Sequence, residues 1–147
     1  MKRQSWHQYF MAIAKTVSTR STCLRRQIGA VVVRDNQILS TGYNGSASGL
    51  EHCLDVGCIR DELNIPSGTD LSTCRAAHAE MNAICKAAKH GVPINDATLY
   101  TTTFPCSMCS KLIVNSGIKV IYYEEGYPDV FSLDILKNIS ILQFISK

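Results

Sequence analysis

The sequence predicts a three-layer α/β/α fold, in which helices cover both faces of a five-stranded mixed sheet. Two observations predict this class: an early hairpin, and a later region where strands alternate with helices and so imply right-handed parallel crossovers. The chain has 147 residues, of which 46% are apolar, enough for one hydrophobic core. We therefore expect a single domain over residues 1–147.

The first predicted elements are a helix and a hairpin. Apolar residues from Trp6 to Val17 fall at helical spacing, which predicts the first helix. The β-branched run from Ile28 to Val33 predicts a strand. The turn signal Asp35-Asn36 leads into a second strand, Ile38 to Thr41, so the two strands should form a hairpin.

A long loop region separates the hairpin from the next helix. Gly42 to Gly49 is rich in glycine and serine, and the irregular segment from Glu51 to Cys74 contains the breakers Pro66 and Gly68. So long a stretch without regular structure is unusual in a small domain. We expect an insertion at about residues 46–75 that something ties to the core.

The second half of the chain alternates between helices and strands. Helices are predicted at Ala76–Lys89, Cys106–Ser116 and Ser132–Lys137, and strands at Leu99–Thr103, Ile118–Tyr123 and Ile139–Ile145. Pro105 opens the second helix, Gly117 ends it, and Ser132 is the expected cap of the third. Such a sheet binds ligands at the carboxyl ends of its strands, near helix N-termini.

Charge and hydropathy exclude several classes of protein. Lys and Arg total 15 against 12 Asp and Glu, a net charge of +3, which excludes a strongly basic nucleic-acid arm and an acidic disordered tail. No apolar run approaches the ~20 residues of a membrane span, and Met1 to Phe10 does not resemble a signal peptide. We expect a cytoplasmic protein with no membrane and no nucleic-acid partner.

Seven cysteines are unusual for such a chain. The number is odd and no secretory signal is present, so a disulfide framework is a poor explanation. Cys85 falls in an apolar helical stretch and is expected to fill the core. The others lie in or beside polar, loop-like segments, where thiolates more often bind metal: Cys23, Cys53, Cys58, Cys74, Cys106 and Cys109.

The first group with metal-ligand spacing lies at two helix starts. Cys106 and Cys109 are three residues apart in one first turn, where the helix N-terminus stabilises thiolates, and His78 opens the neighbouring helix. Three protein ligands leave zinc a fourth position for water, as in catalytic sites. Zinc brings the pKa of that water down toward ~7. Glu80, two residues past His78, can then transfer protons without binding the metal.

Other interpretations of these motifs explain fewer residues. The Cys-x-x-Cys pair alone is also typical of a redox dithiol or of half a zinc ribbon, but neither explains His78 and Glu80. The combination of His-x-Glu with Pro-Cys-x-x-Cys is the signature of zinc-dependent nucleobase deaminases.

Over nearly its whole length the chain resembles the deoxycytidylate (dCMP) deaminase family. The resemblance is carried by Ile28-Gly29-Ala30-Val31-Val32, Gly42-Tyr43-Asn44-Gly45, His78-Ala79-Glu80-Met81-Asn82-Ala83-Ile84, Phe104-Pro105-Cys106 with Cys109, and Ser116-Gly117-Ile118-Lys119. It implies a cytidine-deaminase-like fold and zinc-dependent hydrolysis of dCMP to dUMP and ammonia, which supplies dUMP for thymidylate synthesis. In the implied mechanism, zinc-bound hydroxide attacks C4 of the ring, and Glu80 passes the proton to N3 and to the leaving amino group.

The resemblance also assigns roles at the site. It implies that His78, Cys106 and Cys109 bind the catalytic zinc. It further implies that Asn44 contacts the deoxyribose hydroxyl and that the backbone of Ala79 reads the base. From the residues themselves, three more substrate contacts are candidates. The guanidinium groups of Arg25 and Arg26 suit a 5′-phosphate, and Tyr127 follows a strand at its carboxyl end.

A second metal site is expected in the cysteine-rich insertion. Four soft ligands are enough for a closed tetrahedral zinc that would attach the long loop to the core. The expected ligands are Cys23, Cys53, Cys58 and Cys74, with His52 as a substitute for one of them. The resembled family includes members with and without such a structural zinc. Reduced free thiols in a flexible loop are the alternative.

The resemblance further implies an assembly and its regulation. Members are commonly homo-oligomers, often hexamers, and many are activated by dCTP and inhibited by dTTP. Gly42, Tyr43, Asn44 and Gly45 would then form part of the regulatory site, with Mg²⁺ accompanying the triphosphate.

Several alternative functions stay open. The nearest are other deaminases, acting on tRNA adenosine, free cytidine or guanine; Met108 between the two cysteines is also found in tRNA adenosine deaminases. A tRNA enzyme should carry a broad basic surface, which a charge of +3 does not predict. Free cytidine enzymes need no phosphate site, and their last strands are antiparallel, whereas the helix predicted at Ser132 favours a parallel crossover. A non-catalytic zinc module would not explain Glu80.

Overall fold

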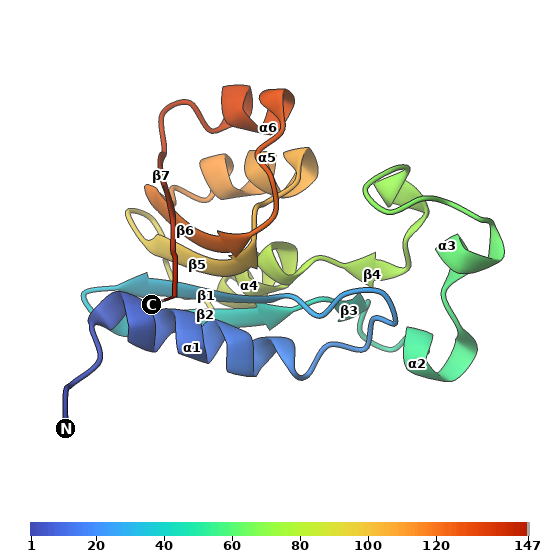
Figure 1. Cartoon of the computed structure of the whole chain (residues 1–147), viewed down its shortest axis with the longest axis horizontal. Helices are drawn as coiled ribbons and strands as arrows, with labels where there is room; N and C mark the ends of the chain where they lie inside the picture. Colours follow the sequence, from blue (N-terminus) through green and yellow to red (C-terminus); the bar gives the residue numbers. More distant parts are fainter. Residues whose placement is uncertain (147) are drawn as a thin grey trace.

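A five-stranded mixed sheet forms the centre of the fold, in the order β2-β1-β5-β6-β7 (Figure 1). The computed structural model describes residues 1–146. The strands are β1 (Gly29–Arg34), β2 (Gln37–Tyr43), β5 (Thr98–Thr103), β6 (Val120–Glu125) and β7 (Ser140–Gln143). The predicted class, with its hairpin and its parallel last strands, is confirmed.

The sheet changes from antiparallel to parallel at β5. β1 pairs antiparallel with β2 through a turn at Asp35 and Asn36, which both have positive φ, as a tight hairpin requires. β1 also pairs antiparallel with β5, whereas β5, β6 and β7 run parallel. The helices between the parallel strands supply the crossovers.

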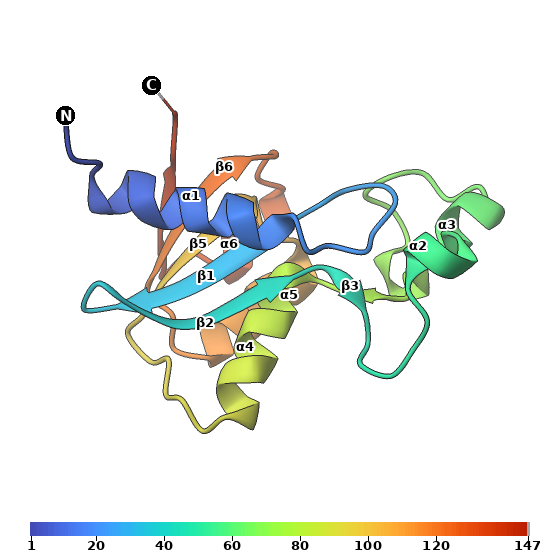
Figure 2. The same ribbon diagram turned by 90° about the horizontal axis from the view of Figure 1, so that it is seen from below.

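Helices cover the two faces of the sheet unequally (Figures 1 and 2). Helix α1 (Trp6–Ser18) covers one face, where Phe10, Met11 and Ala14 pack against β1 and β5. Helices α4 (Ala79–Lys89) and α5 (Ser107–Asn115) enclose the larger core on the other face, and the short α6 (Val130–Ile135) packs on α5.

Three local predictions were wrong. The helix expected from Ala76 begins at Ala79, because Ala76–Ala77 form a short strand, β4. Asp129, not Ser132, caps α6: its carboxylate accepts from the Ser132 backbone N–H at 2.8 Å, and an ionised carboxylate is a strong cap. Cys85 is exposed on α4 rather than buried in the core.

The insertion is an excursion from one end of the sheet, on the right in Figures 1 and 2. It leaves through β3 (Gly45–Ser46) and returns through β4, which pair antiparallel. Between them lie three one-turn elements: α2 (Cys53–Val56), α3 (Ile59–Glu62) and the 3₁₀ turn η1 (Leu71–Thr73). The segment therefore has more regular structure than its sequence predicted. Within residues 1–146, no helix is both long and apolar enough to cross a bilayer.

Candidate metal centre

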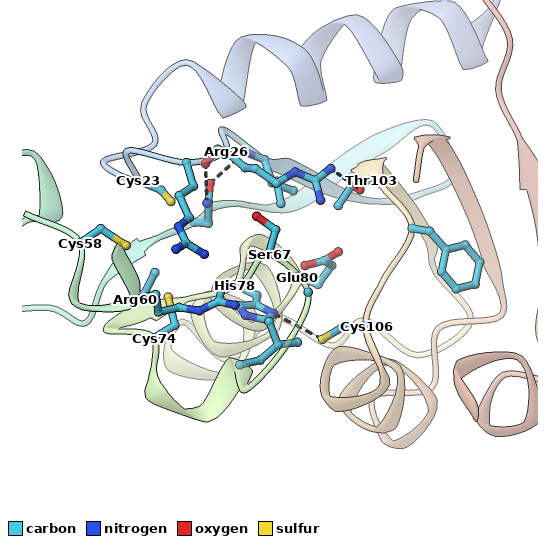
Figure 3. Close-up of a pocket in the computed structure, with 17 residues that line it drawn as sticks. Cys23, Arg26, Cys58, Arg60, Ser67, Cys74, His78, Glu80, Thr103 and Cys106 are labelled. Atoms are coloured by element: carbon cyan, nitrogen blue, oxygen red, sulfur yellow. Dashed lines mark hydrogen bonds between the residues drawn. The ribbon is translucent and has the colours of Figure 1, made fainter. Parts of the chain in front are cut away.

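Two helix N-termini meet where β5 ends. His78 is the N-cap of α4 and Cys106 is the N-cap of α5, both in extended backbone conformation. Neither side chain makes the usual capping hydrogen bond to its own helix. Both are therefore directed at each other, toward the space beyond the helix ends (Figure 3).

The ligand atoms of three residues converge there. His78 Nδ1 lies 3.4 Å from Cys106 Sγ and 3.3 Å from Cys109 Sγ, and the three ligand atoms are all within 4.8 Å of one another. In tetrahedral zinc sites, bonds of roughly 2.3 Å to sulfur and 2.0 Å to nitrogen separate the two ligands by roughly 3.6 Å. One imidazole and two sulfurs at this spacing fit a zinc ion with one coordination position left open.

The electrostatics of the three ligand residues are coupled. Hydrogen bonds from Cys109 and then His78 lower the pKa of Cys106 to about 4, against an opposing effect of burial. The hydrogen bond to Cys106, followed by burial, raises the pKa of Cys109. The hydrogen bond with Cys106 also raises the pKa of His78, and the nearby Arg60 charge acts in the opposite direction. This site therefore already favours a thiolate, the form that binds metal.

Glu80 lies beside the ligands and is only 3% exposed. Its carboxylate accepts a hydrogen bond from Thr101 Oγ1 at 3.3 Å and one from Cys109 Sγ at 3.6 Å. Burial raises the pKa of Glu80, because a charged carboxylate is disfavoured away from water. A raised pKa brings the carboxyl group closer to the range in which it both accepts and returns a proton.

The ligands open into a cavity of about 200 Å³ (Figure 3). His78, Glu80 and Cys106 lie in its wall, together with Phe104 and Asn44. Three arginines also line it: Arg25, Arg26 and Arg60. Arg25 is paired with Asp61 at 2.7 Å, whereas Arg26 and Arg60 have no carboxylate partner among the described residues and bring positive charge that an anionic ligand could complement.

The structure brings three of the predicted substrate residues to this cavity. Asn44 is buried, with Nδ2 donating to Arg26 O and Oδ1 accepting from the Ile28 N–H, each at 2.8 Å. Arg26 donates to Thr103 Oγ1 at 3.1 Å, and Arg25 also lines the wall. Asn44 therefore connects β2 to the segment that carries the two arginines.

The other predicted substrate and regulatory residues lie elsewhere. Ala79 is fully buried in the first turn of α4, next to His78. Tyr127 is 95% exposed and does not line the cavity, so the structure does not bring it to the site. Gly42 and Tyr43 end β2, and Gly45 begins β3.

The cysteines of the insertion lie around the same cavity. Cys23, Cys58 and Cys74 line it, and Cys53 is buried with its Sγ 4.0 Å from Ser46 Oγ. The charges of these three thiols raise the pKa of Cys53, although burial is the larger cause. Within residues 1–146, only His78, Cys106 and Cys109 bring three ligand atoms within 4.8 Å. His52 is the N-cap of α2.

The sequence interpretation missed two residues of the site. Arg60 is only 7% exposed and lines the cavity, although arginines in an irregular segment are normally solvated. Thr101 is fully buried on β5 and donates to Glu80. The position of Thr101 within a predicted strand that leads to Cys106 was a signal that could have placed it near the ligands.

Known proteins resemble the chain over most of its length. A family model described as the cytidine and deoxycytidylate deaminase zinc-binding region matches residues 4–125. The ComE operon protein 2 of Bacillus subtilis is 46% identical over 127 residues, which cover 86% of this chain and 63% of that protein. The deoxycytidylate deaminase of Saccharomyces cerevisiae is 41% identical over 147 residues, covering 98% of this chain and 46% of the yeast protein.

A solved structure has the same fold. The dCMP deaminase from the cyanophage S-TIM5, in complex with dCMP and dUMP, is 28% identical with a TM-score of 0.78. The match covers 98% of this chain and 100% of the cyanophage chain. By contrast, the chain spans less than two thirds of the length of both curated relatives above.

Proposed function

The chain belongs to the cytidine and deoxycytidylate deaminase family, and from this membership we propose that it hydrolyses dCMP to dUMP and ammonia. The observation that supports this most directly is the convergence of His78, Cys106 and Cys109 beside the buried carboxyl of Glu80. The reaction would supply dUMP for thymidylate synthesis.

The metal of the proposed reaction is zinc, which His78 Nδ1 and the two sulfurs of Cys106 and Cys109 would hold. When bound, zinc supplies a nucleophilic water near neutral pH by lowering its pKa. The protein's part is to fix three ligands and leave the fourth position open. The N-termini of α4 and α5 add partial positive charge that stabilises the thiolates.

Glu80 would transfer the protons. It would take one proton from the attacking water and deliver it to N3 of the cytosine ring. It would then take the second proton from the hydroxyl now on C4 and pass it to the amino group, so that the C4–N bond breaks, ammonia leaves and C4 becomes a carbonyl. Its hydrogen bond from Thr101 orients the carboxylate, and its burial keeps competing water away. Proton transfer of this kind contributes typically about 10² to 10⁴ in rate.

A nucleotide rather than a nucleic acid is the proposed substrate. Phe104 offers an aromatic surface in the wall of the cavity, and the cavity's arginines match one 5′-phosphate. The cyanophage dCMP deaminase of the same fold was solved with dCMP and dUMP. Asn44, at the sugar's expected position, would contact the deoxyribose hydroxyl through its remaining hydrogen-bond capacity, and the Ala79 backbone would read the base.

The experiment that tests this function measures ammonia release from several substrates side by side. The zinc-loaded protein is incubated with dCMP, cytidine, guanine and a tRNA hairpin. We expect release from dCMP alone. Release only from another substrate would assign a different deaminase reaction, and no release from any would favour a zinc-binding module without activity.

We propose a second, structural zinc at Cys23, Cys53, Cys58 and Cys74, with His52 able to replace one ligand. The proposal is supported by three of these cysteines lining one cavity, with the fourth, Cys53, buried in the same insertion. A closed tetrahedral site would hold the insertion against the segment before β1.

Regulation and assembly complete the proposal. Activation by dCTP with Mg²⁺ and inhibition by dTTP would act through Gly42, Tyr43, Asn44 and Gly45; the ammonium of Lys86 lies 5.0 Å from the Tyr43 ring centroid and offers one positive charge there. A homo-oligomer, taken to be a hexamer, is supported by exposed apolar side chains on α6: Val130, Phe131 and Leu133. A cytoplasmic location is supported by seven free thiols, typical of a reducing compartment.

A further inference from the structure

The last strand of the sheet, β7, has an open edge. It ends the strand order β2-β1-β5-β6-β7, so only its inner side pairs with another strand of the described chain (Figure 1). On that side the Ser140 N–H donates to Lys119 O at 3.1 Å. Since alternate residues of a parallel strand bond to the neighbouring strand, the backbone groups of Ile141 and Gln143 face outward from the sheet.

This edge lacks the features by which edge strands commonly avoid further pairing. Charged side chains, prolines and bulges are the common protections. Residues 138–145 contain no charged residue and no proline. β6 and β7 also pair without a register shift, whereas at the opposite edge the β1–β2 ladder is irregular between Val32 and Val33. β7 is therefore the edge that is better suited to pair with a further strand.

Apolar side chains are exposed beside the open edge. Tyr100, Tyr122 and Leu142 pair in register and so form one row across the sheet. Tyr100 packs with α1 residues and is only 4% exposed, whereas Leu142, at the end of the row, is 43% exposed. Ile145, just after β7, is 75% exposed. Because β7 has only four residues, these side chains would have to add to its backbone hydrogen bonds in any contact.

The two ends of the edge carry opposite charge. Lys119 and Lys137, both exposed, precede β6 and β7. Glu124 and Glu125 end β6; Glu124 pairs with Lys15, whereas Glu125 is exposed and forms no ion pair with the described residues. Because β6 and β7 run parallel, the lysines lie at one end of the edge and the glutamates at the other. An identical edge running antiparallel would bring opposite charges together at both ends.

We propose that β7 pairs antiparallel with β7 of a second copy of this chain, about a two-fold axis at Leu142. In this register Ile141 lies opposite Gln143 of the second copy, and their outward N–H and C=O groups form the new hydrogen bonds. Leu142 lies opposite Leu142 of the second copy, in the type of pair whose Cα atoms are about 4.5 Å apart, so the two leucines cover each other. One continuous sheet then runs through both copies.

The inference goes beyond the proposed reaction and does not depend on it. It gives the proposed homo-oligomer one specific contact, which is isologous because the same edge contributes from both copies. Both experiments below read the assembly rather than turnover. Failure of the contact and failure of the deaminase reaction are therefore separate results.

The first experiment changes the edge and measures the number of copies by analytical ultracentrifugation of the zinc-loaded protein. Leu142→Lys places like charges opposite each other and should weaken the contact at least about 10-fold, so that the assembly has half as many copies as the parent. Ile38→Lys is the matched control, because Ile38 is 41% exposed on the other edge strand, β2. It should assemble as the parent does. A monomeric parent, or Leu142→Lys assembling as the parent does, would overturn the proposal.

The second experiment tests the register by cross-linking. Leu142→Cys is combined with Cys85→Ala, which removes an exposed thiol. Cα atoms about 4.5 Å apart are within disulfide range, so mild oxidation should join most chains into covalent dimers. Ile145→Cys in the same background should stay single, because Ile145 lies opposite Ile139 of the second copy. Equal cross-linking of the two variants, or none at position 142, would contradict the two-fold pairing.

Discussion

Gly42 packs directly on the first turn of α4, at Ala79. A Cβ at position 42 would lie 2.2 Å from the Ala79 carbonyl oxygen and 2.4 Å from the Ala83 nitrogen. Only a glycine allows β2 to approach the helix so closely. Since Ala79 lies between His78 and Glu80, this contact fixes the positions of the proposed metal ligand and of the proposed proton carrier together.

Gly42→Ala should therefore damage both stability and zinc binding. The added methyl group meets the backbone of α4 at Ala79 and Ala83, so α4 must shift away from β2. Overpacking of this kind typically costs about 1–3 kcal/mol in the free energy of unfolding. We expect a lower Tm and a reduced zinc content, measured by thermal unfolding and by atomic emission. An unchanged Tm and an unchanged zinc content per chain would show that the contact between Gly42 and Ala79 does not require a glycine.

Glu80→Gln should keep the zinc and lose the activity. The amide has the same shape but cannot accept and return a proton as a carboxylate does. The kcat for dCMP should therefore fall about 10²- to 10⁴-fold. Stability should not fall, because the change removes a buried ionisable group whose pKa is raised by burial. Zinc content and Tm are the controls, and a variant that turns over normally would exclude Glu80 as the proton carrier.

Cys58→Ala should remove the second metal. The zinc-replete protein is expected to hold two zinc ions per chain and the variant one, with a lower Tm because the insertion loses its attachment. Cys85→Ala is the matched control, since Cys85 is exposed on α4 and outside both groups. One zinc per chain in the parent, with Cys58→Ala unchanged in stability, would rule out the structural site.

Addition of dCTP should change the response to dCMP. If the triphosphate activates the enzyme, saturation curves recorded at several dCMP concentrations should move to lower substrate concentration with dCTP and Mg²⁺, and to higher concentration with dTTP. Curves that are identical with and without both nucleotides would remove regulation from the proposal.

The cap of α6 should make stability depend on pH in acid. Hydrogen bonds from Ser132, through its side chain and then its backbone, lower the pKa of Asp129 in the folded state. The contribution of this cap to the free energy of unfolding is therefore complete above the pKa of about 3.9 that Asp has in the unfolded chain. It is lost as the pH falls through the lower pKa that Asp129 has in the folded protein. Asp129→Asn should flatten that acid dependence, whereas Asp129→Ala should cost about 1 kcal/mol at neutral pH. Parallel acid profiles for Asp129→Asn and the parent would contradict this.

Sequence patterns predicted the structure correctly where turn and helix signals agree with the pattern of buried residues. The hairpin followed from Asp35-Asn36, because a turn depends on residues close in sequence. The convergence of His78, Cys106 and Cys109 followed from a motif that begins two helices. The other residues that line the cavity were harder to predict from the sequence. Arg60 and Ser67 reach the cavity only because of how the insertion folds, and the insertion has no hydrophobic periodicity from which its fold could be predicted. Tyr127 illustrates the reverse error, since its position after a strand does not determine where the side chain lies.

The paired two-residue strands β3 and β4 have a further consequence. The excursion that carries Arg60 begins and ends at adjacent positions, so its length and composition can change while the central sheet stays where it is. The segment between β3 and β4 can therefore be replaced by another sequence without moving the central sheet. A chimaera that receives the corresponding stretch of a distant relative should therefore keep the central sheet and the convergence of His78, Cys106 and Cys109 unaltered.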